Sequence, residues 1–192
     1  MSRIEPLLKR NRAFALTGAH EGQEPKPNLG LFVITCLDPR VDPAHLLGTE
    51  LGDLVVVRNE GGRVTEDVID KVAFIVTLVE LSGDPNPGFE LAVIHHTNCM
   101  TSYLANDEVR KLYADRIGAD EAELADLAVI DPAATVAHDV ALLRAAPVIP
   151  SSVTVSGHVY DVGTGLINTV VVDNAIGESS GKCAVPGAEG AV

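Results

Sequence analysis

The sequence contains no tryptophan, and aromatic residues make up only 4% of its 192 residues. Valine, isoleucine, leucine and alanine are plentiful instead, and hydrophobic residues account for 46% of the chain. This composition is typical of parallel strands covered by helices on both faces, and the length suits one domain with a substantial core. We therefore expect an α/β fold, with a central, mostly parallel sheet of about four to five strands flanked by helices.

Basic residues are scarce: 14 lysines and arginines face 27 acidic residues, and the formal net charge is −13. A protein that binds nucleic acid or an anionic membrane needs a basic face to replace counterions, so this balance argues against both partners. No apolar run approaches the ~20 residues that would span a bilayer. We expect a protein that binds a small molecule and neither nucleic acid nor membrane.

Cysteine is also scarce, with three residues in the whole chain. The first residues, Met1 to Pro6, lack the long apolar segment of a secretory signal, so we expect a cytoplasmic location. In a reducing compartment, a close grouping of cysteine and histidine indicates metal binding or catalysis more often than a disulfide. Cys183 falls in a segment rich in glycine, alanine and serine, and we expect no role for it.

The hydrophobic pattern divides the chain into three parts, which are a helical arm with its loop (1–28), an α/β domain (29–173) and a flexible tail (174–192). Within the domain, short β-branched runs predict strands at 31–35, 54–57, 90–94, 153–160 and 166–172. Helical patterns cover 65–81, 101–127 with a break near Gly118, and 133–146. The 65–81 helix is apolar nearly all round, which predicts burial on more than one side, against the sheet and against another subunit.

Two of these strands end in side chains that can bind a metal. Cys36, Asp38 and Arg40 follow the first strand, and His96 and Cys99 follow the third. Because ligands of open parallel sheets bind beyond the carboxyl ends of the strands, these side chains can converge. Two thiolates and one imidazole match the preference of zinc, and three protein ligands leave a fourth position open for water or substrate.

Asp38 has two roles open to it beside such a zinc ion. It can accept the proton of a bound water, or it can displace that water and become the fourth ligand. Arg40 can hold Asp38 by a two-pronged charged hydrogen bond. A structural zinc in a scaffold or binding module is the alternative, and its signature would be a fourth committed protein ligand or a missing Asp/Arg pair. The pair is present, which favours an enzyme.

The remaining histidines favour other interpretations. His95 points away from His96 if the strand continues, which predicts a core histidine with satisfied hydrogen bonds rather than a further ligand. His45 and His158 could relay protons to solvent, but a surface or packing role is favoured for both.

The motifs together resemble those of the β-class carbonic anhydrases, from about Leu31 to Val172. Cys36-Leu37-Asp38-Pro39-Arg40 resembles the family's C-x-D-x-R motif, and His96-Thr97-Asn98-Cys99 resembles its H-x-x-C motif. The segments 58–62 and 157–165 resemble an intervening glycine-containing stretch and a late strand with its turn.

The resemblance implies zinc held by Cys36, His96 and Cys99, and metal-bound hydroxide that attacks carbon dioxide to give bicarbonate. It also implies that Arg40 pairs with Asp38 in an open state, and that loss of this pair lets Asp38 bind zinc and close the site. Members of the family are dimers or larger, so the resemblance implies a homodimer or homotetramer.

Three residues depart from the family pattern. Met100 stands where glycine is usual, Glu60 where alanine is usual, and Asn98 where aspartate is common. A long Met100 side chain beside a ligand would reshape a small-molecule pocket. Within the same superfamily, carbonyl sulfide hydrolases have similar ligands, so hydrolysis of carbonyl sulfide to hydrogen sulfide and carbon dioxide is the alternative reaction.

Overall fold

A computed structural model describes residues 2–81 and 88–175 of the chain. The elements follow one another as α1 (Glu5–Ala15), β1 (Leu31–Cys36), α2 (Pro43–Leu47), β2 (Leu54–Asn59), η1 (Glu60–Gly62), α3 (Glu66–Leu81), β3 (Glu90–His96), η2 (Met100–Ala105), α4 (Asp107–Ile117), α5 (Glu121–Asp126), α6 (Pro132–Ala145), β4 (Thr154–Tyr160) and β5 (Ile167–Ala175). Among the described residues, no helix is long and apolar enough to cross a bilayer.

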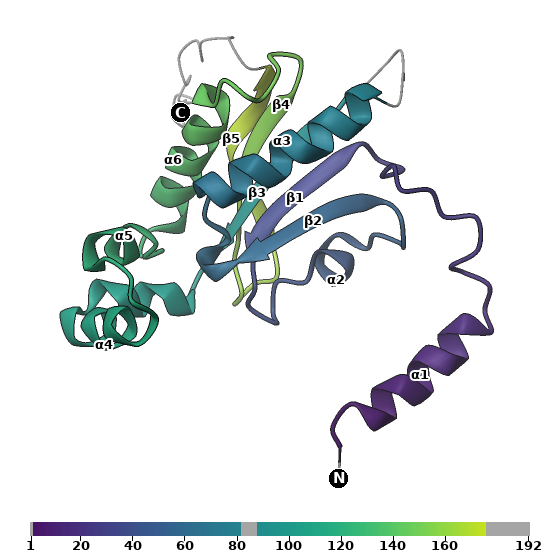
Figure 1. The fold of residues 1–192 in the computed structure, drawn as a ribbon, viewed down its shortest axis with the longest axis horizontal. Coiled ribbons are helices and arrows are strands. Elements are labelled where there is room, and N and C mark those ends of the chain that lie inside the picture. Colours follow the sequence, from purple (N-terminus) through teal and green to yellow (C-terminus); the bar gives the residue numbers. More distant parts are fainter. Residues whose placement is uncertain (1, 82–87, 176–192) are drawn as a thin grey trace, which may run out of the picture.

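The strands form one five-stranded sheet in the order β2-β1-β3-β4-β5 (Figure 1). The first four strands of this order are parallel, and β5 runs antiparallel to β4 at the edge. The prediction of a central, mostly parallel sheet flanked by helices is therefore confirmed. Because β1 pairs with β3, the ends of these two strands lie next to each other although about 60 residues separate them in sequence.

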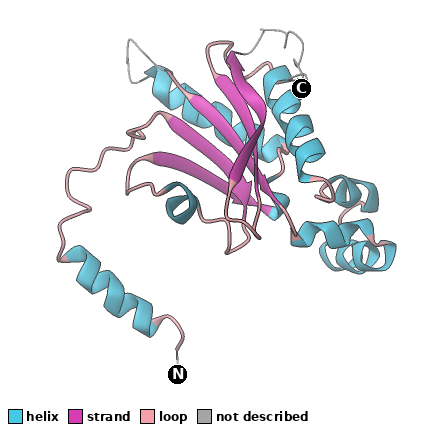
Figure 2. Cartoon of the chain, turned by 180° about the vertical axis from the view of Figure 1, so that it is seen from behind, coloured by secondary structure: helices cyan, strands magenta, loops and turns pink. Residues whose placement is uncertain are grey.

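The main core lies between the sheet and the two long helices α3 and α6, which is visible in Figures 1 and 2. Alternate residues of β1, Phe32 and Ile34, point into this core, while Val33 joins a smaller cluster on the other face. This alternation is the period of a strand. It also sends neighbouring residues at the end of a strand to opposite faces.

Helix α3 is buried on one side only within this chain. Val68, Val72 and Val76 face the core, whereas Phe74 remains 61% exposed and Leu78 is also exposed. The predicted burial of this helix against the sheet is therefore confirmed, and no second side is covered by the described residues. The second apolar side is a surface that another molecule could bury.

Helix α1 stands apart from the sheet, and none of its residues is buried (Figure 1). It ends at Ala15, and Gly18, shortly after that end, adopts a left-handed conformation that does not continue a helix. At the other end of the chain, β5 continues to Ala175 and so includes the first two residues of the predicted tail. The rest of that tail, with Cys183, lies outside the described residues.

The predicted helical region 101–127 is divided into three shorter elements. Met100–Ala105 forms a 3-10 helix, and two α-helices follow it on either side of Gly118, whose φ of 70° ends the first of them. Asn106 and Asp120 cap the two α-helices with their side chains. These short elements pack beside the carboxyl end of the sheet and form one wall of the site.

Candidate metal centre

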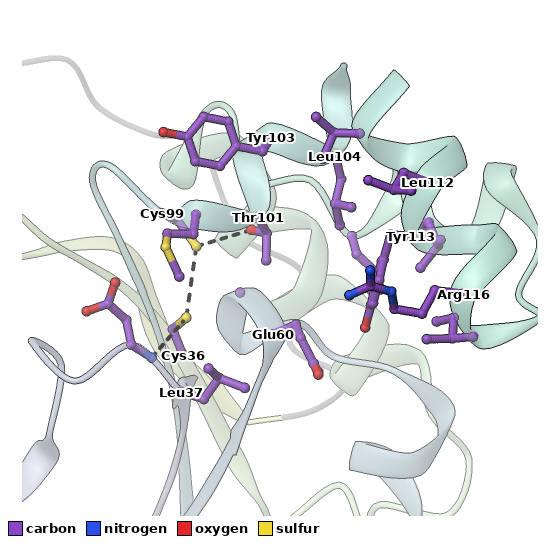
Figure 3. Close-up of a pocket in the computed structure, with 17 residues that line it drawn as sticks. Cys36, Leu37, Glu60, Cys99, Thr101, Tyr103, Leu104, Leu112, Tyr113 and Arg116 are labelled. Atoms are coloured by element: carbon purple, nitrogen blue, oxygen red, sulfur yellow. Dashed lines mark hydrogen bonds between the residues drawn. The ribbon is translucent and has the colours of Figure 1, made fainter. Parts of the chain in front are cut away.

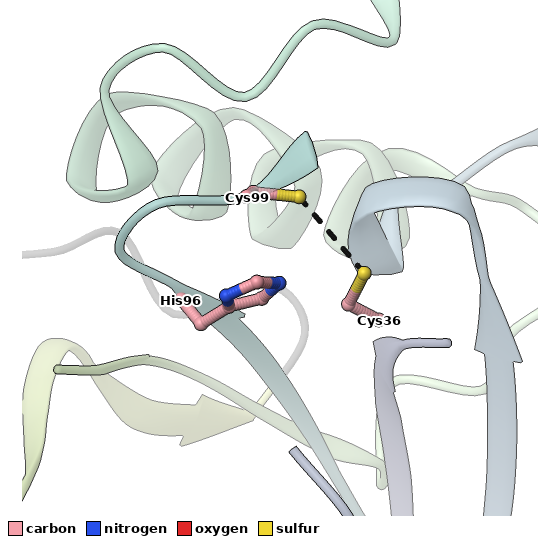
Figure 4. Close-up of side chains that lie close together, drawn as sticks. All are labelled: Cys36, His96 and Cys99. Atoms are coloured by element: carbon pink, nitrogen blue, oxygen red, sulfur yellow. Dashed lines mark hydrogen bonds between the residues drawn. The ribbon is translucent and has the colours of Figure 1, made fainter. Parts of the chain in front are cut away.

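Three side chains from the ends of β1 and β3 meet at the carboxyl edge of the sheet (Figure 4). The sulfur atoms of Cys36 and Cys99 and a ring nitrogen of His96 all lie within 4.8 Å of one another, and all three residues are buried. The two sulfur atoms are 3.9 Å apart. The sequence prediction that these residues converge is therefore borne out by the geometry.

The hydrogen bonds of His96 leave one ring nitrogen free for a metal. Nδ1 lies 2.9 Å from the carbonyl oxygen of Thr97, so Nδ1 carries the proton and donates it. Nε2 is then a lone-pair donor, and it is buried without a hydrogen-bond partner among the described residues. An unpartnered buried acceptor is costly. A cation bound by Nε2 and the two sulfur atoms removes that cost, so these residues fit zinc.

The environment of the two cysteines favours a thiolate at Cys99. The mutual hydrogen bond raises the pKa of Cys36 and lowers the pKa of Cys99 to about 4, so the pair shares one proton. The backbone N–H of Asp38 donates to the Cys36 sulfur at 3.4 Å. The hydroxyl of Thr101 lies 3.1 Å from the Cys99 sulfur. A divalent cation readily displaces the shared proton, because metal binding and thiol ionisation are coupled.

Thr101 was not identified from the sequence. Its hydroxyl oxygen accepts a hydrogen bond from the backbone N–H of Val129, which leaves the hydroxyl proton free to be donated to Cys99. The contact therefore supports the charged form of the sulfur. The sequence indicated this role only weakly, because a hydroxyl residue two positions after a candidate ligand is common in any chain.

Asp38 and Arg40 form a two-pronged ion pair beside the three ligands. Arg40 Nε donates to Asp38 Oδ1 at 2.9 Å, and Arg40 Nη2 donates to Oδ2 at 2.7 Å. The Arg40 backbone N–H adds a third hydrogen bond to Oδ1. These hydrogen bonds outweigh burial and lower the pKa of Asp38 to about 2. The carboxylate is therefore ionised and is held by Arg40.

Asn98 explains part of how this pair is held. It has a φ of 54°, and it is the single non-glycine residue with a positive φ among those described. Its carbonyl oxygen accepts a hydrogen bond from Arg40 Nη2 at 3.0 Å. Asparagine and aspartate both tolerate this left-handed conformation. Asparagine in place of the family's common aspartate therefore keeps the turn between His96 and Cys99.

Arg58 is a second residue whose role the sequence did not reveal. From the end of β2, its side chain donates to the carbonyl oxygens of Cys36, at 2.9 Å, and Asp38, at 2.7 Å. It also lies 3.4 Å from the Asp42 carboxylate. These contacts fix the turn that carries both Cys36 and Asp38. The sequence feature that could have indicated this role is the position of Arg58 at the end of β2, the strand next to β1.

A cavity of about 520 Å³ opens beside the sulfur atoms and extends towards α4 and α5 (Figure 3). Its walls are mostly apolar, and polar groups enter it from Asp38, Glu60, Tyr113 and Arg116. Glu60 and Met100, two of the residues that depart from the family pattern, both line it. The Met100 side chain is 65% exposed. Both departures therefore lie where a substrate would enter, and neither contributes a ligand atom.

The other histidines lie where the sequence predicted. His95 points away from His96 into the core and has hydrogen-bond partners on both ring nitrogens. His45 is exposed on α2. His158 contacts Ser156 and Thr169 on the sheet.

An open α/β sheet with a Cys–His–Cys group at its carboxyl edge defines a candidate zinc protein. A sequence profile of the family described as carbonic anhydrase matches residues 31–167. The chain belongs to this family, and its relatives are β-class carbonic anhydrases and carbon disulfide hydrolases.

Three relatives illustrate the range of this family. β-Carbonic anhydrase 1 of Mycobacterium tuberculosis is 26% identical over 75% of this chain and 83% of its own length. The carbon disulfide hydrolase of Acidithiobacillus thiooxidans is 30% identical over 72% of this chain and 75% of its own length. The crystal structure of a carbonic anhydrase from Streptococcus mutans has a TM-score of 0.71 and 33% identity, covering 88% of this chain and 98% of that one.

Proposed function

We propose that this protein hydrates carbon dioxide to bicarbonate with the help of zinc. The observation that carries the proposal is the unpartnered Nε2 of His96 facing the sulfur atoms of Cys36 and Cys99, with the Asp38–Arg40 pair beside them. The family supports the same activity class. Cys36, His96 and Cys99 would hold the zinc ion.

Zinc bound there would act as a Lewis acid that lowers the pKa of water, to roughly 7 in good cases. Asp38 would accept a hydrogen bond from that water and orient it, because its carboxylate is ionised and lines the cavity. Arg40 would hold Asp38 in place through the two-pronged hydrogen bond. The apolar wall of the cavity suits an uncharged molecule such as carbon dioxide.

The same pair would also give the protein an inactive state. If Arg40 releases Asp38, the carboxylate is free to act as a fourth zinc ligand. In that state the position for water is taken, and the site is closed. The ion pair with Arg40 is therefore the contact that distinguishes an open site from a closed one.

A second candidate reaction is the hydrolysis of a thiocarbonyl molecule, carbonyl sulfide or carbon disulfide. The name of the Acidithiobacillus relative and the apolar cavity lined by Met100 favour it. Such molecules are larger and more polarisable than carbon dioxide, and they gain more from apolar contacts. Their hydrolysis would release hydrogen sulfide.

Stopped-flow assay of carbon dioxide and headspace assay of both thiocarbonyl molecules, on purified protein with measured zinc content, test these proposals together. Fast hydration of carbon dioxide supports the first reaction. Selective release of hydrogen sulfide supports the second. One zinc ion per chain with neither activity, near neutral and at alkaline pH, contradicts both and favours a structural zinc in a non-catalytic protein.

Met100→Ala tests the link between the cavity and the substrate. Loss of the exposed thioether should lower kcat/KM for a thiocarbonyl substrate about fivefold, which corresponds to roughly 1 kcal/mol of apolar contact. Zinc content and carbon dioxide hydration should stay unchanged, because Met100 contributes no ligand atom. An equal loss on both substrates would contradict a selective role for Met100.

We further propose that the protein acts as a homodimer or homotetramer. The apolar side chains Leu7, Leu8 and Phe14 of α1 are exposed, and this helix carries Lys9 and Arg10. The whole chain has a net charge of −13, so a basic helix is attracted to the body of a second copy. The exposed apolar side of α3 offers a further surface for such contacts.

A further inference from the structure

A second group of buried polar side chains lies behind the metal centre, on the core side of the sheet. It consists of Arg63 after η1, His95 on β3, and Thr135 and Asp139 on α6, and we call it the Asp139 cluster. The side chains of His95 and Asp139 are 0% exposed. Buried charged groups are expensive unless they are paired. The cluster therefore needs an explanation.

Asp139 is the centre of this cluster. Arg63 Nε and Nη2 donate to its two oxygens at 2.8 and 2.9 Å, and the backbone N–H of Val64 donates to Oδ2 at 2.9 Å. His95 Nε2 lies 3.3 Å from the same oxygen. Arg63 Nη1 also donates to the carbonyl oxygen of Asp126. Asp139 thus ties the segment that follows η1 to helix α6.

The contacts of His95 decide where its proton lies. Nε2 is 3.1 Å from the carbonyl oxygen of Gly62 and also faces Asp139, and neither group can donate a hydrogen bond. Nε2 must therefore carry a proton and donate it. Nδ1 lies 2.9 Å from the hydroxyl of Thr135, which fixes the ring. His95 therefore holds the carbonyl of Gly62.

Gly62 connects this cluster to a zinc ligand. It has a φ of 70°, and a Cβ atom on it would lie 2.7 Å from the carbonyl carbon of Thr35 and 2.8 Å from the nitrogen of Cys36. The η1 turn thus packs directly against the backbone of Cys36. Its other glycine, Gly61, lies close enough for its backbone N–H to act on the pKa of Cys36. A shift of this turn would move the backbone that packs against the ligand.

We propose that His95 and Asp139 are positioning residues for the metal centre, acting through the carbonyl of Gly62 and the packing of the η1 turn against the backbone of Cys36. The inference rests on the proposed zinc site, and it adds residues that touch neither the ligand atoms nor the cavity. His95 and His96 are neighbours on β3 that point to opposite faces, so one strand end serves both the ligand and its support.

The test compares His95→Leu with His95→Gln in the full-length zinc-loaded protein. Leucine removes the donor to Gly62, whereas the glutamine amide can replace the Nε2 proton. The measurements are the rate of zinc release to a chromophoric chelator and the visible spectrum of the cobalt-substituted protein. We expect release to be roughly tenfold faster in His95→Leu, the lower end of the range for residues that support metal ligands. His95→Gln should stay within about threefold of the parent.

Two further variants separate positioning from general stability. Leu143 lies one helical turn from Asp139 on α6, is equally buried and packs in the hydrophobic core, and Leu143→Ala is the control variant. It should lower the melting temperature and leave zinc release and the cobalt spectrum unchanged. Thr135→Val removes the hydroxyl that contacts His95 Nδ1, together with its hydrogen bonds to the carbonyl oxygens of Asp131 and Pro132, and keeps the side-chain shape. It should speed zinc release about fivefold, the value of roughly one hydrogen bond, even if His95→Leu does not fold.

The outcomes distinguish this inference from the proposed activity. Parent-like zinc release and cobalt spectrum in Thr135→Val and His95→Leu overturn the inference, as does equal acceleration by Leu143→Ala. A parent protein that binds zinc without turnover, while His95→Leu releases it faster, overturns the proposed activity and supports the positioning role. A parent protein that binds no zinc overturns both.

Discussion

At the scale of single residues, the candidate site depends on the ion pair between Asp38 and Arg40. Asp38 is buried and has its pKa lowered to about 2 by Arg40, while the Arg40 side chain itself is 47% exposed. An exposed guanidinium can leave without a large desolvation cost. The pair therefore holds the carboxylate firmly yet can be broken from the solvent side.

Arg40→Ala should lower carbon dioxide hydration by roughly 10–100-fold, the range for residues that support a metal site. Without Arg40, Asp38 loses two hydrogen bonds and is free to bind zinc. Stopped-flow rates across neutral and alkaline pH measure the effect. Arg40→Lys is the matched variant, and it should restore little, because lysine cannot form the two-pronged contact. Full activity of Arg40→Ala would contradict the proposed role.

The acid stability of the protein should depend on the same pair. The pKa of Asp38 is lower in the folded chain than its ordinary value of 3.8. Its contribution to the free energy of unfolding is therefore complete above about pH 4 and is lost as the pH falls through about 2. Urea unfolding of the parent and of Arg40→Ala at several acidic pH values measures this contribution to the free energy of unfolding. The difference between the two proteins should shrink across that window, and a constant difference would contradict it.

The ligands were the part of the site most accessible to sequence reasoning. Cys36, His96 and Cys99 each follow an apolar run, and the carboxyl ends of parallel strands meet. Thr101 and Arg58 were missed, because their roles depend on which backbone groups they reach. Asp139 was also missed, although its place in the sequence was informative, since it lies on the apolar face of its helix, three residues after the buried Val136.

At the scale of elements, the short η1 turn has a strict steric requirement for glycine. Both of its glycines have a positive φ, and Gly62 lies in van der Waals contact with the backbone of Thr35 and Cys36. A backbone cannot give way as a flexible side chain can. The turn therefore has room for glycine alone at this point.

Gly62→Ala should lower the free energy of unfolding by roughly 2–4 kcal/mol, from the left-handed conformation and the steric overlap together. Gly118→Ala is the matched control, because Gly118 has the same φ of 70° and no atom within 4 Å of a Cβ. It should cost only about 1–2 kcal/mol. Chemical unfolding measures both variants. Equal losses of unfolding free energy in the two variants would show that the steric overlap with Cys36 does not affect stability.

The order of elements followed from the sequence more closely than their packing did. Strand runs and glycine breaks predicted all five strands and the stop at Gly118. The sequence predicted that α3 is apolar on more than one side, and the structure shows that the side with Phe74 and Leu78 is exposed within this chain. The hydrophobic pattern identifies what must be buried and leaves the partner open.

At the scale of the whole molecule, two apolar surfaces lack a cover within the described chain. One is the side of α3 that carries Phe74 and Leu78, and the other is the apolar side of α1. Exposed apolar patches of this kind mark protein interfaces. An assembly of identical chains would bury both surfaces without a further partner.

Removal of residues 1–16 should therefore lower the oligomeric state. We expect the full chain to have the mass of a homodimer or homotetramer by size-exclusion chromatography with light scattering, and the truncated chain a smaller one. Leu8→Asp should act in the same direction, whereas the charge change Arg10→Ala should have a weaker effect. An unchanged mass after truncation would contradict a role for α1 in assembly.

The pairing of β1 with β3 also sets the order of events when the chain folds. Cys36 and His96 lie about 60 residues apart in sequence and meet only after these two strands have paired. Such distant parallel pairing is slow, because the chain loses loop entropy before the contact forms. A zinc ion at the proposed site would therefore find its complete set of ligands only late in folding. The metal should slow the unfolding of the finished protein and leave its rate of folding unchanged.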